Sequence, residues 1–210
     1  MSKRVWVIWN DRYHARETYQ PLAARLFGGA GWDVHASEDI RELLAVATPP
    51  ALVVNFCAGR PEGQPALSPD EQRQLAAAVV SGMGMLYVHA GLTLIEVDTP
   101  LYELARGRFA SHPPEQSPVS CAALPGVSHA ILKGIAPFSA VDEHYFCQTA
   151  LEGSQPFLYT TSIHGTEIGG WAHQRGAGRV ACLTPGHTAA MLEQMAGLIA
   201  NAAAWCAGQA

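Results

Sequence analysis

Three histidines in this chain each stand shortly after a hydrophobic run of the kind that forms a buried parallel strand. His14 follows residues 5–9, His89 follows residues 85–88, and His187 follows residues 180–184. Ligands of an open α/β sheet bind beyond the carboxyl ends of its strands, so we expect the three imidazoles to share one crevice. Imidazole exchanges protons near neutral pH and is a common metal ligand. The pattern predicts a small-molecule site with acid–base or metal chemistry, in which His14, His89 and His187 are candidate ligands of a divalent metal such as Zn.

A polar cluster, Asp142-Glu143-His144-Tyr145, adds carboxylates to these candidates. In an extended chain Asp142 and His144 share one face, while Glu143 and Tyr145 share the other, so one pair can point to the crevice. A glutamate beside a histidine can act as a general base or orient a metal ligand. An edge strand with a solvated polar face would carry the same residues.

Two further residues are candidate substrate contacts. His112 lies in a proline-rich loop that could cover the crevice, and Trp9, at the end of the first predicted strand, could offer a flat face to a sugar ring. Each candidate has a structural alternative. Tryptophan is commonly a core residue, a buried His89 can bond to a backbone carbonyl, and His14 can lie in a solvated loop.

The elements that position these residues alternate between strand and helix over the first 90 residues. The pattern predicts strands over 3–9, 32–35, 51–56 and 85–88, and helices over 18–27, 40–46 and 68–81. Ser68 and Glu71 form a capping box with Pro69 at the first helical position. This alternation indicates a parallel sheet with right-handed crossovers.

The second half of the chain is less regular. Its residue pattern predicts a short helix over 100–106, strands over 119–124, 140–146, 157–161, 169–173 and 179–184, and a closing helix over 188–206. His173, after Trp171, is expected to be a hairpin residue. The 210 residues are enough for one sizeable domain, 1–210, and too few for two.

Composition excludes several classes of protein. The net charge is −5 with scattered Lys and Arg, so no nucleic-acid partner is expected, and no apolar run is long enough to span a membrane. The first residues lack the features of a signal peptide, and the five cysteines contain no CxxC pair, which indicates a cytoplasmic protein without a disulfide framework. No Walker A or Gly-x-Gly-x-x-Gly pattern predicts a nucleotide site, and no Gly-x-Ser-x-Gly elbow predicts a serine hydrolase.

From about residue 51 to 205, the order of several short motifs resembles the ThuA-like family of trehalose-utilisation proteins. The matching pieces include Gly-Met-Leu-Tyr-Val-His-Ala (84–90), Ser128-His129-Ala130-Ile131, Asp142-Glu143-His144-Tyr145, Gly178-Arg179-Val180, Gly186-His187, and Asn201 with Trp205. The resemblance implies the fold of class I glutamine amidotransferases, an α/β fold with a flavodoxin-like, doubly wound, mostly parallel sheet. It also implies a saccharide substrate, and it favours Glu143 over Asp142 as the reactive carboxylate.

The same resemblance predicts that glutaminase activity is absent. The amidotransferases place a cysteine nucleophile on a strand-to-helix turn, where this chain has His89. Ala189 stands where their glutamate follows the catalytic histidine, for which His187 is the counterpart. An imidazole cannot form the thioester that a thiolate forms.

The leading hypothesis is an enzyme that acts on a sugar or an oxidised sugar derivative. His89, His187 and Glu143 would be catalytic, and the substrate contacts would be His14, His112, Tyr145 and Trp9. The alternatives are a non-catalytic sugar-binding or accessory subunit of an oxidoreductase, and a hydrolase that kept the amidotransferase scaffold. Metal content and the geometry of the histidines separate the enzyme from the binding or accessory subunit, because a binding module does not need convergent imidazoles.

The closing helix over residues 188–206 predicts a homodimer. Its outer positions Ala189, Ala196, Ala200 and Ala204 are small rather than charged, which permits close approach of a second subunit. Light scattering at micromolar concentration should give about twice the chain mass of 22.4 kDa. A monomer in that measurement would refute the dimer, and the small face would then be an alanine-rich solvated surface.

Overall fold

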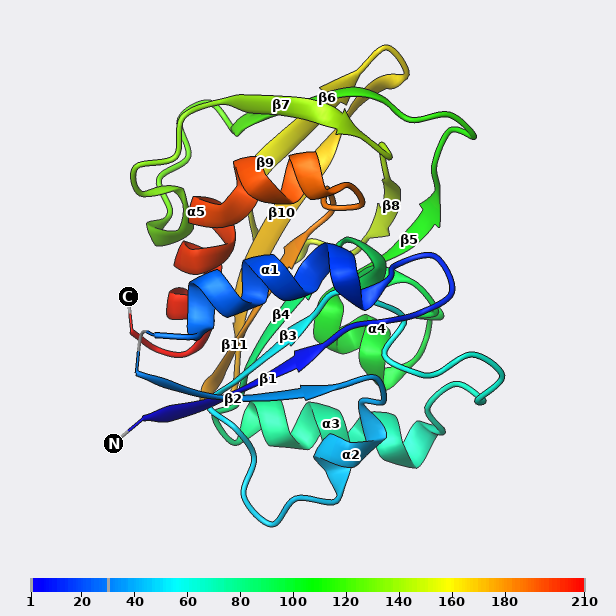
Figure 1. The fold of residues 1–210 in the computed structure, drawn as a ribbon, viewed down its shortest axis with the longest axis vertical. Coiled ribbons are helices and arrows are strands. Elements are labelled where there is room, and N and C mark those ends of the chain that lie inside the picture. The colour runs from blue at the N-terminus through cyan, green and yellow to red at the C-terminus, as the bar shows by residue number, and fades with distance from the viewer. Residues whose placement is uncertain (1, 30, 210) are drawn as a thin grey trace.

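Five parallel strands form the half of the sheet that carries the predicted histidines (Figure 1). The computed structural model describes residues 2–29 and 31–209. The parallel strands are β1 (Lys3–Ile8), β2 (Trp32–Ser37), β3 (Leu52–Asn55), β4 (Gly84–Val88) and β11 (Gly178–Leu183). They lie in the order β2-β1-β3-β4-β11, which is the order of flavodoxin-like sheets, the fold that the resemblance implied, and their parallel pairing is what the alternating pattern predicted. Every residue of β3 and β4 is buried, as expected for strands covered on both faces.

Four antiparallel strands extend this sheet beyond β11. They are β10 (Gly165–Arg175), β9 (Gln155–Ser162), β6 (Ser117–Ala123) and β7 (Phe138–Asp142), in that order. Two short strands outside the predicted set, β5 (Gly107–Ser111) and β8 (Phe146–Thr149), pair as a separate sheet. The single strand predicted over residues 140–146 is wrong, because β7 ends at Asp142 and the chain crosses to the second sheet before Phe146.

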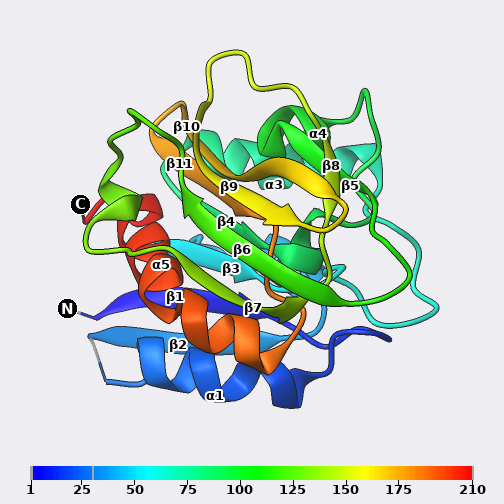
Figure 2. The same cartoon turned by 90° about the horizontal axis from the view of Figure 1, so that it is seen from above.

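Helices cover both faces of the large sheet (Figures 1 and 2). One face carries α1 (Arg16–Phe27) and α5 (Ala189–Cys206), and the other carries α2 (Arg41–Leu44), α3 (Pro69–Val80) and α4 (Pro100–Ala105). Single turns of 3₁₀ helix follow β4, as η1 (His89–Leu92), and precede β7, as η2 (Ala130–Leu132). The predicted capping box is confirmed, since Ser68 and Glu71 exchange their hydrogen bonds and Pro69 opens α3.

Helix α5 is the most apolar helix, and the chain itself covers much of it. Met191, Met195 and Leu198 are fully buried, and each such side chain contributes about 1.5–3 kcal/mol by leaving water. Besides the sheet, α5 contacts α1, β7 and η2 (Figure 2). A Cβ atom at Gly197 would lie 3.3 Å from the Cδ1 atom of Ile135. Packing within one chain therefore accounts for part of the apolar surface of α5. No helix among the described residues is long and apolar enough to cross a membrane.

His173 lies on β10 and is buried between that strand and α4. Its Nε2–H group donates to the carbonyl of Leu104 at 3.0 Å, and its Nδ1 atom accepts from the hydroxyl of Ser154 at 3.1 Å. Burial, together with the charge of Arg106, lowers the pKa of His173 to about 4. The folded protein therefore holds this imidazole neutral.

We expect His173 to make the folded state less stable in mild acid. Its folded pKa lies below the unfolded value of 6.5, so as pH falls below 6.5 only the unfolded chain takes up the proton. The cost approaches about 1.4 kcal/mol per pH unit. Urea unfolding at pH 7.5 and 5 should show a smaller loss of stability in His173→Gln than in the wild-type protein. Equal losses in the two proteins would contradict this assignment.

Candidate functional site

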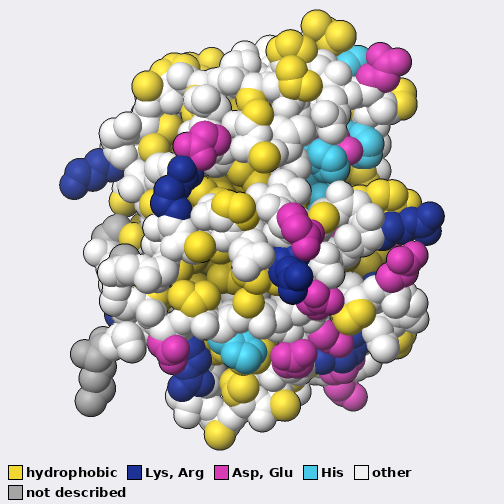
Figure 3. Space-filling model, in the orientation of Figure 1, with side chains coloured by type: hydrophobic (Ala, Val, Ile, Leu, Met, Phe, Trp, Pro, Cys, Tyr) yellow, Lys and Arg dark blue, Asp and Glu magenta, His cyan; other side chains and the backbone are white. Residues whose placement is uncertain are grey.

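A pocket of about 920 Å³ opens at the carboxyl edge of the parallel strands. Loops that follow β1, β3 and η1 line it together with residues of β5. Its base carries a group of polar side chains: His14, His112, Glu143, Tyr145 and His187. On the face drawn in Figure 3, histidine side chains gather around an acidic one. This position matches the general rule for ligand sites of open α/β sheets.

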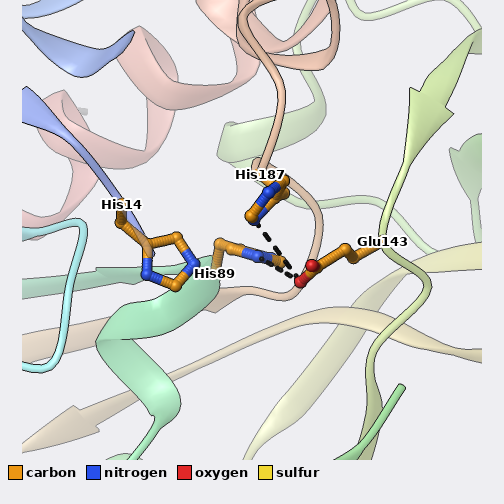
Figure 4. Close-up of side chains that lie close together, drawn as sticks. All are labelled: His14, His89, Glu143 and His187. Atoms are coloured by element: carbon orange, nitrogen blue, oxygen red, sulfur yellow. Dashed lines mark ion pairs between the residues drawn. The ribbon is translucent and has the colours of Figure 1, made fainter. Parts of the chain in front are cut away.

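Four side chains converge at the base of this pocket (Figure 4). The ring centroids of His14, His89 and His187 lie 5.1–5.4 Å apart, as their placement after three strands predicted. Glu143 joins them, and one ligand atom from each of the four residues lies within 4.8 Å of the others. The four residues come from four separate segments, and only the fold brings them together.

His14 is held by Asp11 in the same loop. The Oδ1 atom of Asp11 accepts the Nδ1–H group of His14 at 2.7 Å, and Oδ2 accepts the backbone N–H of Ala58 at 2.9 Å. Burial raises the pKa of Asp11, but these hydrogen bonds and the charge of His14 outweigh it and bring the pKa to about 2. An ionised Asp11 fixes the proton of His14 on Nδ1, which leaves Nε2 for the cluster.

His89 begins the tight turn from β4 into η1. It is fully buried and has a left-handed backbone, with φ at 49°. Its Nδ1–H group donates to the backbone carbonyl of Thr184 at 2.9 Å, so its Nε2 atom faces Glu143 at 3.4 Å. A Cβ atom at Gly91 would lie 2.3 Å from the carbonyl oxygen of Asn55, so this turn requires glycine there.

His187 lies in the loop between β11 and α5, where Asp142 holds the backbone. The two carboxylate oxygens of Asp142 accept the N–H groups of Gly186 and Thr188, each at 2.8 Å. Asp142 is completely buried. The Nδ1 atom of His187 lies 3.4 Å from the carboxylate of Glu143. Asp142 therefore connects the segment that carries Glu143 to the loop that carries His187.

Ring nitrogens of the cluster are buried without hydrogen-bond partners. His14 Nε2, His89 Nε2 and His187 Nδ1 are buried without a hydrogen-bond partner. In a neutral imidazole only one nitrogen carries a proton, and in His14 and His89 it is Nδ1. Two lone pairs and a carboxylate thus face the same small space. Buried lone pairs beside a carboxylate favour a cation in that space, either a proton or a metal ion.

Electrostatics favour an ionised Glu143 and a neutral His187. Burial raises the pKa of Glu143, but the close approach of His89 and the positive charge that His187, His89 and His112 can carry outweigh this, so the net pKa falls below the usual value. Burial lowers the pKa of His187, and the charges of His89 and His14 lower it further against the opposing effect of Glu143. A carboxylate and a neutral imidazole are the forms that bind a metal or accept a proton.

Two other predicted contacts lie beside the cluster. His112 donates from Nδ1 to the carbonyl of Pro113 at 2.6 Å and places Nε2 at 3.9 Å from Glu143. Tyr145 stacks on His89 with ring centroids 3.8 Å apart. Glu143 and Tyr145 face the cluster, as expected for residues on one face of an extended chain. Their neighbours Asp142 and His144 point elsewhere. His144 is buried against Ser162 and Thr160.

Trp9 does not join these residues. It belongs to the main hydrophobic core, as the alternative for this residue expected, and it lines a separate hollow beside Arg16 and Ser37. Tyr13, whose side chain is 73% exposed, is an aromatic residue that the pocket does present.

A family model described as ThuA, trehalose utilisation, matches residues 4–206. The chain belongs to the ThuA family. The match begins in the first strand, so ThuA similarity extends over the N-terminal segment that the short motifs left out. It includes every member of the cluster.

Solved structures with the same fold include further ThuA-like proteins. One from Parabacteroides merdae has 15% identity and a TM-score of 0.77, over 99% of this chain and 90% of that chain. One from Bacteroides uniformis has 15% identity and a TM-score of 0.73, over 97% of this chain and 91% of that chain. A β-galactosidase from Rahnella has 13% identity and a TM-score of 0.64, over 95% of this chain but 31% of that chain. The comparison with curated proteins finds no match.

Two residues outside the cluster, Asp11 and Asp142, hold its members in place, and the sequence analysis did not predict these roles. Asp11, three residues before His14, does not cap the following helix, because α1 begins at Arg16 without a side-chain cap. The carboxylate of Asp142 stands next to Glu143, and no local pattern indicates that its partners lie more than 40 residues away. The three-residue spacing of Asp11 and His14 could have indicated their hydrogen bond, whereas the partners of Asp142 can be found only from the fold.

We expect Asp142→Asn to destabilise this ThuA protein by about 2–4 kcal/mol. The amide keeps one acceptor oxygen and turns its NH₂ group toward a buried backbone N–H, so a charge-assisted hydrogen bond is lost and a donor is left unpaired. Denaturant unfolding measures the change. Asp33→Asn, at an exposed position on β2, is the matched control and should stay within about 0.5 kcal/mol of the wild-type protein. Similar small effects of both substitutions would contradict the role of Asp142.

Proposed function

We propose that this protein is an enzyme of carbohydrate metabolism that acts on a sugar or an oxidised sugar in the pocket above the cluster. Membership of a family described by trehalose utilisation supports the substrate class. The observation that carries the enzymatic part is the convergence of three imidazoles and Glu143 with buried, unpaired ligand atoms. A non-catalytic sugar-binding or accessory subunit has no need of that arrangement.

The proposed roles follow from where each side chain lies. Glu143, ionised and between His89 and His187, is positioned to accept a proton, and the two imidazoles can hold or return it. His14, His112 and Tyr145 surround this centre and would contact the substrate. Trp9 keeps no such role in this proposal. Because position 89 holds an imidazole rather than a thiolate, we also propose that the protein has no glutaminase activity.

We further propose that His14, His89, His187 and Glu143 bind a divalent metal ion. Three imidazoles with one carboxylate suit Zn or another late first-row ion, and the buried unpaired nitrogens fit this use. A bound ion would supply Lewis-acid polarisation of a substrate carbonyl. Asp11 and the carbonyl of Thr184 bind the outer nitrogens of His14 and His89, as partners of metal-ligating histidines do.

Zinc titration of metal-free protein tests the metal site. A ligand that binds only the folded state stabilises it by about 2.7 kcal/mol at 100 times its Kd, so Zn should raise the Tm of the wild-type protein. His187→Ala should lower the affinity for Zn at least tenfold, because it removes one ligand. His164→Ala removes an exposed histidine away from the cluster and should change nothing. An unchanged wild-type Tm would contradict the metal proposal. The proposal of acid–base chemistry at Glu143 does not depend on this result.

Turnover of a panel of neutral and oxidised saccharides tests the enzymatic proposal. Glu143→Gln should lower the rate by about 10²–10⁴-fold, the usual contribution of a positioned acid or base. Binding of a saccharide without turnover by the wild-type protein would favour the accessory-subunit alternative.

A further inference from the structure

Three arginines line the outer part of the pocket, and two of them are neutralised there. The Nη1 atom of Arg12 lies 3.4 Å from Glu62, and that of Arg108 lies 3.2 Å from Glu96. All four of these side chains line the same pocket. The two pairs therefore add little net charge to the space that a ligand would occupy.

The third arginine, Arg60, has no such counter-charge. It follows β3, lines the pocket and is partly buried. Its guanidinium donates to the backbone carbonyl of Gln64. Across the described ranges, no carboxylate forms an ion pair with it. A guanidinium stays protonated at any physiological pH, so Arg60 brings an uncompensated positive charge to the pocket wall.

The remaining carboxylates of the pocket are already engaged. Asp11 accepts hydrogen bonds from His14 and from the backbone of Ala58. Glu143 lies between the imidazoles of the cluster. Neither forms an ion pair with Arg60, so among the groups that line the pocket none is a direct ion-pair partner for this guanidinium, and a ligand could supply one.

We infer that the substrate carries an anionic group, a carboxylate or a phosphate, which Arg60 binds. The planar guanidinium fork pairs with either group through two parallel hydrogen bonds, and partial burial strengthens that pairing relative to water. The bond to Gln64 already holds part of the fork in place. This inference rests on the proposed function, since it concerns the same pocket, and it narrows the substrate class to sugar acids or sugar phosphates.

Binding at Arg60 would also orient the substrate. The anionic group would lie against the loop after β3, and the pocket of about 920 Å³ leaves room for the rest of a saccharide to extend to the cluster. Arg60 is thus a specificity-determining residue rather than a catalytic one. A neutral saccharide would leave its charge uncompensated.

Calorimetric titration with gluconate, glucose 6-phosphate and glucose tests this inference. At least one of the two anions should bind the wild-type protein at least tenfold more tightly than glucose, and which anion does so identifies the group. Arg60→Gln should remove at least tenfold of that affinity. Arg73→Gln is the matched control, because Arg73 is an exposed arginine on α3 that pairs with Asp70, and it should bind as the wild-type protein does.

Three results would overturn the inference: glucose binding as tightly as both anions, an unchanged anion affinity in Arg60→Gln, or no binding of any of the three probes. Zinc titration of Arg60→Gln separates this failure from that of the proposed metal site. The variant retains all four candidate ligands, so it should bind Zn as the wild-type protein does.

Discussion

The carboxylate of Asp142 joins two parts of the chain that strand pairing does not bring together at the site. β7 lies at the far edge of the antiparallel half, whereas the loop of His187 follows the last parallel strand. Because both oxygens of Asp142 accept backbone N–H groups of that loop, His187 has a defined position relative to Glu143. The sheet alone would set neither this spacing nor the approach of Glu143 to His89.

The turn at His89 stands where the resemblance to the amidotransferases implies their nucleophile turn. A left-handed backbone at a residue other than glycine costs of the order of 1–3 kcal/mol, and here the bond from Nδ1 to Thr184 and complete burial hold it in place. In the amidotransferases this kind of turn presents a cysteine. In this chain it presents an imidazole nitrogen to a carboxylate, the arrangement on which our proposal of proton transfer or metal binding rests.

Hydrophobic runs predicted the parallel half of the fold well, because a strand buried on both faces leaves a simple signal. The same logic brought His14, His89 and His187 to one edge, since each follows such a strand. The prediction was wrong over residues 140–146, where apolar residues at the start and aromatic residues at the end resemble one strand. There β7 ends at Asp142, whose carboxylate binds the backbone of Gly186 and Thr188, and those partners are distant in sequence. Trp9 shows a second limit, because a residue at a strand end can point either to the crevice or to the core.

The candidate site takes its histidines from the parallel half of the sheet and Glu143 from a connection in the antiparallel half. The early β–α units can form their own contacts soon after synthesis, because the loops that they close are short. The last parallel strand and His187, however, lie close to the C-terminal end of the sequence. While the chain is still emerging from the ribosome, its histidines are separate, ordinary imidazoles. Any reactivity of the cluster therefore begins only after the segment that carries His187 has been made and has folded against the earlier strands.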